Sequence, residues 1–557
     1  MAVTPTTEAD APAPATPPLT PPWDRRRVSL AAIVVAAVVG LGLSSGHVGL
    51  RPHTLIDGLG AIGSIFRRAW PPRWDDFAFD LRQGWLSFMM AVTATAIAAV
   101  LSFPLALLAA RNTAPNRVVG TLARAAIILL RAIPGLVLAL IFVSALQIGP
   151  LPGTLGLGLH SVGMVAKLLA DAIEESDPGP ADAFRSAGAG RLQTALGAVV
   201  PQVVPGLASV LLYRLEINMR DSAVVGLVGG GGIGFLLQST LQTDRWPTSF
   251  GLILIIIGYV LVIEQIGSQT RKRLLAPPAP AVGGQPTRAE PGLGTDGQTA
   301  TTPPWTAGRV TARFGAVALL AFVGYCCTRV ELTPAALARG LPKLTRVTGQ
   351  LLTPDLSHLG TLVNELVMTV EIGAVGTALG LLLAVPVSLL AARNVAPAAW
   401  VTHVARYVLV VVRAVPELAI AVVFVAAVGL GPFAGVLALA VVAFWFGAKL
   451  LADDLELEDP GPREAATATG ANRFQQVWAT TVPAQLPALV GACLYDFDIA
   501  LRTSTVLGVV GAGGVGYGLD SSIRTLHYHV AGAYLLGIFV LVYGVELVAA
   551  RIRHLLI

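Results

Sequence analysis

The chain alternates long apolar stretches with short polar segments along almost its whole length. Most of these stretches are long enough to cross a membrane as a helix, which takes about 20 apolar residues. The predicted helices lie near residues 29–46, 84–109, 119–147, 155–172, 200–228 and 250–270, and near residues 311–329, 360–391, 401–429, 433–452, 482–510 and 531–550. We therefore predict an all-α polytopic membrane protein with about 12 transmembrane helices.

The composition excludes most other classes of protein. Hydrophobic residues make up 54% of the 557 positions, charged residues make up 13%, and the mean hydropathy is +0.70, so a soluble catalytic domain has no room. The net charge of +5 comes from short arginine-rich loops, which indicates membrane topology and not nucleic-acid binding. The three cysteines form no C-x-x-C pair, and we expect no metal site and no cofactor.

The second half of the chain repeats the first at an offset of 282 positions. FPLALLAARNTAP at 103–115 matches VPVSLLAARNVAP at 385–397. Residues 103–234 match residues 385–516 without a gap at roughly two positions in five, which identifies an internal duplication. We therefore divide the chain into repeat 1, residues 29–275, and repeat 2, residues 310–557.

Two segments lack the apolar residues that a packed fold needs. We expect residues 1–28 to be a disordered cytoplasmic tail and residues 276–309, rich in Pro, Gly and Thr, to be a flexible cytoplasmic linker. Basic residues precede the first predicted helix, follow the second and the sixth, and close the chain, which places both termini in the cytoplasm. The arginines within residues 51–82 would then lie outside, and we expect part of that loop to follow the membrane surface.

Two polar loops, at residues 177–201 and 459–483, carry the most specific motif in the chain. In each loop a D-P-G-P sequence is followed by a short alanine-rich segment with an acidic residue, and a glycine comes six positions after that acid. Small residues allow a short helix to lie deep in the groove of a partner, and glycine allows a sharp turn. These residues are Asp182, Ala183 and Gly188 in the first loop and Glu464, Ala465, Ala466 and Gly470 in the second.

The second loop resembles the EAA loop of ABC importer permeases, with its E-A-A-x-x-x-G core and a distal proline, Pro483. In that family the loop forms a short helix that docks on a cytoplasmic ATPase, so the resemblance implies that both loops couple the chain to ATP hydrolysis. The first loop departs from the pattern, because Asp182 stands in place of the glutamate and Phe184 in place of the second alanine. An ordinary amphipathic connection is the alternative interpretation.

The resemblance extends to the phosphonate branch of these permeases through MRDSAVVGLVGGGGIG at 219–234 and LRTSTVLGVVGAGGVG at 501–516. It implies two permease subunits fused in one chain of a bacterial plasma membrane, working with two ATPase subunits and an extracytoplasmic substrate-binding protein that delivers a phosphonate- or phosphate-like oxyanion. The chain contains no P-loop motif, so we predict a transport subunit and not an enzyme. A secondary transporter of two six-helix halves is the alternative function.

A glycine motif follows the fifth predicted helix of each repeat. Gly511, Gly513 and Gly516 satisfy G-x-G-x-x-G, and the same pattern begins at Gly229 in repeat 1. This motif binds a dinucleotide only within a βαβ unit, which neither repeat supplies. A third interpretation, a membrane-bound nicotinamide enzyme, is therefore supported by the glycines alone. We expect the glycines to allow sharp turns and close packing of helices, and the resemblance places Gly231 and Gly513 near an extracytoplasmic gate.

Ionisable residues within the predicted helices mark a candidate pathway, because charges in a membrane are costly and usually face the interior. Two pairs lie at i,i+4 spacing with the acid first, so each either neutralises itself or offers its arginine to an anion. The pairs are Glu216 with Arg220 and Asp498 with Arg502. Arg214 and Asp496 stand at equivalent positions of the two repeats, and we predict that they pair across a pseudo-twofold axis.

Two further pairs of residues at equivalent positions have two possible roles each. Arg131 and Arg413 precede Pro134 and Pro416, and they either line the pathway or interact with the cytoplasmic end of the third helix. The hydroxyl groups of Ser222 and Ser504 either donate to an oxyanion or bond to backbone carbonyls one turn back.

Overall fold

A computed structural model describes residues 39–49, 52–275 and 307–556, and the regular elements in these ranges are all helices. Seven helices are long and apolar enough to cross a membrane, or up to 11 when each bent pair counts as one span. The predicted class, an all-α polytopic membrane protein, is confirmed. The first predicted helix is described only from residue 39, and the predicted tail and most of the predicted linker lie outside the described residues.

The two repeats contain the same series of helices. Repeat 1 contains a helix at 39–47, α2 (Pro52–Ala69), α3 (Phe77–Ala109), α4 (Arg117–Ala132), α5 (Gly135–Leu146), α6 (Pro150–Glu174), α7 (Pro178–Ser186), α8 (Arg191–Thr194), α9 (Val200–Val225), α10 (Gly232–Gln242) and α11 (Trp246–Leu275). Repeat 2 contains α12 (Ala307–Arg329), α13 (Pro334–Leu351), α14 (Leu359–Ala391), α15 (Ala399–Ala414), α16 (Glu417–Val428), α17 (Pro432–Leu457), α18 (Gly461–Ala468), α19 (Arg473–Gln476), α20 (Val482–Gly508), α21 (Val515–Arg524) and α22 (Tyr528–Leu556).

The third predicted helix of each repeat is broken, so the prediction of one continuous span was wrong. α4 and α5 meet at an angle of 87°, and α15 and α16 meet at 84°. Pro134 and Pro416 cause the breaks, because proline has no N–H to donate and forces the residue before it out of the helical conformation. Ile133 and Val415 accordingly have extended ψ angles of 119° and 127°.

Each repeat contributes a helix that packs on the other repeat. α13 of repeat 2 packs on α5 of repeat 1, and α2 packs on α16 in the same manner. Gly58 of α2 lies against Val428, and Gly340 of α13 lies against the equivalent Leu146, so the absence of a side chain allows both contacts. α12 packs on α3 through the ring of Phe322. The sequence analysis predicted neither α2 nor α13 as a helix, and these two helices connect the repeats.

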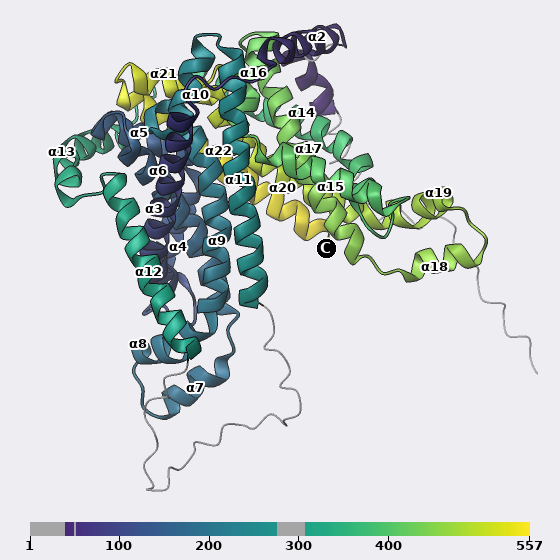
Figure 1. Ribbon diagram of the computed structural model, residues 1–557. Coiled ribbons are helices and arrows are strands. Elements are labelled where there is room, and N and C mark those ends of the chain that lie inside the picture. The colour runs from purple at the N-terminus through teal and green to yellow at the C-terminus, as the bar shows by residue number, and fades with distance from the viewer. Residues whose placement is uncertain (1–38, 50–51, 276–306, 557) are drawn as a thin grey trace, which may run out of the picture.

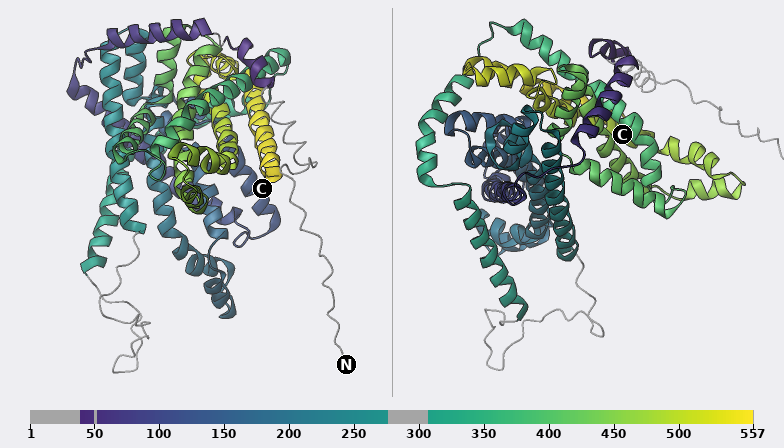
Figure 2. Two further views of the ribbon diagram at one scale, coloured as in Figure 1. Left: turned by 90° about the vertical axis from the view of Figure 1, so that its right-hand side faces the viewer. Right: turned by 45° about the horizontal axis from the view of Figure 1, so that its top comes forward.

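The two repeats form an inverted V (Figure 1). They lie close together at the end that holds α10, α16 and α21, and they diverge toward α7 in one repeat and α18 in the other. The right-hand view of Figure 2 shows the same divergence. The two polar loops therefore lie at the separated ends of the V, and the glycine motifs lie at the closed end.

Candidate functional site

The polar loops form short helices that project from the transmembrane body. In α7 only Ala181 is buried, and no residue of α18 is buried. Asp177 and Asp459 begin the turns before these helices, where each carboxylate accepts from the backbone N–H of the glycine two positions on, at 2.9 Å. The predicted coupling residues Asp182, Ala183, Glu464 and Ala465 are exposed, and Ala466 is half-buried.

Gly188 and Gly470 end these helices in the same conformation. Both have a φ of +82°, which residues with a side chain rarely adopt. The next N–H, of Ala189 or Ala471, donates back to the carbonyl of Phe184 or Ala466, and this bond closes a Schellman turn. No heavy atom lies within 4 Å of a Cβ placed on either glycine, so the backbone turn, and not internal packing, requires glycine here.

Phe184, which stands in place of the second alanine of the motif, is accompanied by a second difference between the repeats. A Cβ placed on Gly197 would collide with the Phe184 ring. The equivalent pair in repeat 2 is Ala466 and Ala479. Repeat 1 therefore has a phenylalanine and a glycine where repeat 2 has two alanines. The phenylalanine ring packs against the segment that leads into α9.

The repeated AARN motif attaches the loop before α4 to the end of α6. Glu174 accepts from the backbone N–H of Arg111 at 2.8 Å, and the equivalent Glu456 accepts from the backbone N–H of Arg393 at 2.7 Å. Glu456 also accepts from the Arg406 guanidinium at 2.6 Å. These bonds hold the loops before α4 and α15 against the ends of the helices that precede α7 and α18.

The glycine motifs form turns that are pinned at three points. Gly229 and Gly511 have positive φ angles, and their carbonyls accept from the N–H groups of Gly149 and Gly431 at 3.0 and 2.9 Å. Gly231 and Gly513, also with positive φ, lie against Pro150 and Pro432. The hydroxyl groups of Ser87 and Thr369 accept from the first turns of α10 and α21, at 3.0 and 2.8 Å.

The last glycine of each motif allows close packing of two helices, as the sequence predicted. A Cβ on Gly234 would fall on the carbonyl oxygen of Ala223, and a Cβ on Gly516 would fall on that of Thr505. α10 and α21 therefore lie directly on the backbone of α9 and α20. The described helices contain no βαβ unit around either motif.

A layer of charged residues crosses the boundary between the repeats. Glu216 of α9 is 2% exposed, and its carboxylate pairs with Arg413 of the other repeat. Arg413 also donates to Glu264 of α11 at 3.2 Å. The pairing of Glu216 with Arg220 that their spacing allowed is therefore not formed, although Asp498 and Arg502 do pair within α20, at 2.5 Å.

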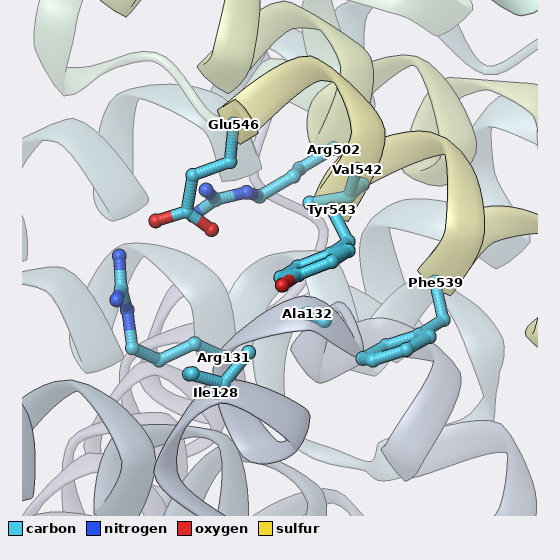
Figure 3. A pocket seen from close by; sticks show the side chains of 8 residues that line it. All are labelled: Ile128, Arg131, Ala132, Arg502, Phe539, Val542, Tyr543 and Glu546. Carbon is cyan, nitrogen blue, oxygen red and sulfur yellow. The ribbon is translucent and has the colours of Figure 1, made fainter. Parts of the chain in front are cut away.

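The equivalent contact on the other side is open. Arg131 of repeat 1, which corresponds to Arg413, forms no ion pair with a described residue. Figure 3 shows Arg131 and Arg502 pointing toward Glu546, which corresponds to Glu264, across a small cavity between the repeats. Arg131 and Arg413 thus lie at the boundary between the repeats.

Trp445 accounts for part of this asymmetry. Both Arg220 and Arg413 lie over its ring, at 5.9 and 5.7 Å from the centroid. The equivalent residue of repeat 1 is Gly163, where a Cβ would collide with Leu130. Repeat 1 therefore has no ring on which its arginine can rest, and cation–π attraction favours only one of the two contacts.

One other prediction about this layer was wrong. Arg214 does not pair with Asp496; it donates to Ser161 at 2.8 Å, within a chain of hydrogen bonds inside repeat 1. Ser222 and Ser504 donate to the carbonyls of Met219 and Leu501, at 2.7 and 2.9 Å, which is the second of the two roles that the sequence allowed them.

Comparison with known proteins decides the family. Residues 102–266 and 384–556 match the family described as binding-protein-dependent transport system inner membrane component, once in each repeat. The chain belongs to this family. It is 44% identical over 522 residues to the phosphate-import permease protein PhnE of Mycolicibacterium smegmatis, covering 92% of this chain and 93% of that protein. It is also 41% identical over 248 residues to the phosphite transport system permease protein PtxC of Stutzerimonas stutzeri, covering 44% of this chain and 89% of that protein.

A solved structure of the MetNI methionine ABC transporter is also similar, with 23% identity, a TM-score of 0.33, and coverage of 36% of this chain and 99% of that chain. The family assignment rests on the sequence matches. They confirm the predicted resemblance to importer permeases, the fusion of two permease units in one chain, and the role as a transport subunit. Both family segments contain a projecting helix and a glycine turn, whereas α2, α12 and α13 lie outside them.

Several residues of this permease site escaped the sequence analysis. Ser87 and Thr369 bond to the glycine turns, Glu174 and Glu456 bond to the loops before α4 and α15, and Glu264, Glu546 and Trp445 belong to the charged layer. The repeat offset contained a signal for some of them, because Glu174 aligns with Glu456 and Glu264 with Glu546. An acidic residue that occurs at the same position of both halves, at or near the end of an apolar stretch, is a candidate for making the same contact in each half.

Proposed function

We propose that this chain forms the complete transmembrane core of an ABC importer that moves phosphate-, phosphite- or phosphonate-like oxyanions into a bacterial cell. Two separate cytoplasmic ATPase subunits drive it, and an extracytoplasmic binding protein delivers the substrate. The observation that carries this proposal is the pair of exposed helices α7 and α18, which project at equivalent positions of two repeats and end on the same positive-φ glycine. The similarity to a phosphate-import permease and a phosphite permease supports the substrate class.

The proposed orientation places α7, α18 and both termini in the cytoplasm. The V then opens inward, and the glycine turns close the outer end. When ATP brings the two ATPases together, α7 and α18 approach one another, the cytoplasmic ends of the repeats converge, and the glycine turns separate. Arg131, Arg220, Arg413 and Arg502 supply positive charge along the boundary that an oxyanion would cross. Hydrolysis returns the core to the V.

Replacing both Gly188 and Gly470 with aspartate tests the coupling role. The new side chains point into open space, and aspartate tolerates the left-handed conformation better than most residues, so the membrane body remains folded. We expect uptake and substrate-stimulated ATP hydrolysis to fall about tenfold or more, the effect of losing a typical coupling free energy. Both activities are measured in proteoliposomes beside membrane yield. Normal uptake by the double variant would refute the coupling role.

A secondary transporter of two six-helix halves is the competing function, and co-purification separates the two. We expect the tagged full-length chain, extracted in mild detergent, to retain a P-loop ATPase at about two copies per chain, because two coupling helices are present. Mass spectrometry identifies the ATPase and any binding protein that accompanies it. Absence of an ATPase after crosslinking at α7 and α18, together with uptake driven by an ion gradient, would favour the secondary transporter.

A further inference from the structure

A second polar site lies between the two glycine turns, at the closed end of the V. A cavity of about 410 Å³ separates α10 of repeat 1 from α21 of repeat 2, and the positive-φ Gly511 forms part of its wall. This volume is within the usual range of small-molecule sites. Among the described residues that line the cavity, Arg524 is the one basic residue and Asp520 is the one acidic residue.

Asp520 holds Arg524 in a position that leaves most of its donors unused. The Nε of Arg524 donates to Oδ2 of Asp520 at 2.6 Å. The Asp520 side chain is 11% exposed, whereas the Arg524 side chain is 54% exposed. Its two terminal nitrogens bond to no described residue, and a guanidinium with these nitrogens free presents the fork that binds an oxyanion through two hydrogen bonds.

The other repeat contributes neutral donors to the same cavity. Gln238 and Gln242 of α10 occupy the positions that correspond to Asp520 and Arg524 of α21. Neither amide has a side-chain hydrogen bond within the described part of the chain. Equivalent positions of the two repeats therefore place an ion pair on one side of the cavity and two amides on the other. An anion held by Arg524 would meet the amide donors on the repeat 1 side and no second carboxylate.

We propose that this cavity is an oxyanion-binding site of the permease itself. Arg524 holds the anion through its terminal nitrogens, Asp520 positions Arg524, and Gln238 and Gln242 contact the anion from the opposite repeat. The direction of transfer rests on the proposed function: the binding protein would release its oxyanion into this site, directly outside the glycine turns, before the gate opens. The binding of the anion requires no ATPase.

The test is equilibrium dialysis of radiolabelled inorganic phosphate against the purified full-length chain in detergent, for wild type, Arg524→Gln, Arg524→Lys and Arg245→Gln. Arg245 is the matched control, because it pairs with Asp75 at 2.7 Å, is 56% exposed, and lies outside the cavity. We expect one saturable site in wild type and in Arg245→Gln. Binding should weaken about tenfold or more in Arg524→Gln, and less in Arg524→Lys, which keeps the charge but loses the fork.

A second variant addresses the repeat 1 side. Gln238→Glu conserves the size of the side chain and places a negative charge opposite Arg524, so phosphate binding should be lost while the chain still elutes as a single species in size-exclusion chromatography. The proposal is overturned if wild type binds no phosphate, if Arg524→Gln binds as well as Arg245→Gln, or if Gln238→Glu binds normally. Failure of the proposed function would instead show as an absence of co-purifying ATPase, with phosphate binding unaffected.

Discussion

Replacing Arg413 with alanine should abolish uptake and destabilise the protein by about 3 kcal/mol, because removal of one partner leaves a buried charge with only a weaker contact. Glu216 is 2% exposed, and its remaining contact is with Arg271 at 3.7 Å. Glu264 loses its partner as well. Stability is measured by thermal unfolding of the purified chain in detergent, and uptake is measured in proteoliposomes with ATPase and binding protein.

Arg131→Ala is the matched control, since it makes the same chemical change at the equivalent position of repeat 1, where no ion pair with a described residue exists. We expect its stability to remain within about 1 kcal/mol of wild type. Arg413→Met combined with Glu216→Gln should recover most of the stability without restoring uptake, because the buried charge is removed together with its partner. If Arg131→Ala were as destabilising as Arg413→Ala, the asymmetry of the charged layer would be refuted.

Replacing Gly516 with alanine should also stop uptake, with a loss of about 3 kcal/mol from overpacking. The new methyl group would fall on the backbone carbonyl of Thr505, and backbone atoms within α20 cannot move aside as a flexible side chain would. α21 would have to lift away from α20, and the turn that contains Gly511 and Gly513 would shift with it. We expect Gly234→Ala to behave in the same way, because its methyl group meets the carbonyl of Ala223.

Gly491→Ala provides the control for these glycine variants. Gly491 lies inside α20, and no heavy atom lies within 4 Å of a Cβ placed on it. Because alanine has the higher helix propensity, this change should be neutral or stabilising by up to about 1 kcal/mol. Uptake and melting temperature are measured as for Arg413. Wild-type uptake by Gly516→Ala would show that the turn tolerates separation of α20 and α21.

Local signals in the sequence were sufficient to predict a structural feature where that feature depends on residues close together in the chain. Apolar length predicted the spans, since a membrane-crossing helix satisfies its own backbone. The 282-residue offset predicted two equivalent halves, and the alanine-rich segments before Gly188 and Gly470 predicted the projecting helices. Pro134 and Pro416 also contained the signal for the broken spans, although apolar length alone had suggested continuous helices.

Local sequence signals could not predict contacts between residues that lie far apart in the chain. The spacing of Glu216 and Arg220 allowed an ion pair along one helix, but the structure pairs Glu216 with Arg413, 197 positions away. Likewise, alignment of the repeats suggested that Arg214 meets Asp496, whereas Arg214 bonds within its own repeat.

The sequence by itself determined the class of protein, the duplication, the projecting helices and the glycine turns, because each depends on apolar length, repetition or the backbone freedom of a few adjacent residues. The tertiary structure alone decided which charges meet, how α2 and α13 connect the repeats, and which of two equivalent arginines is paired. These outcomes depend on how two halves of similar sequence pack together, and a single difference such as Trp445 against Gly163 shifts that packing. Internal symmetry makes two contacts possible, and packing at the boundary favours one of them.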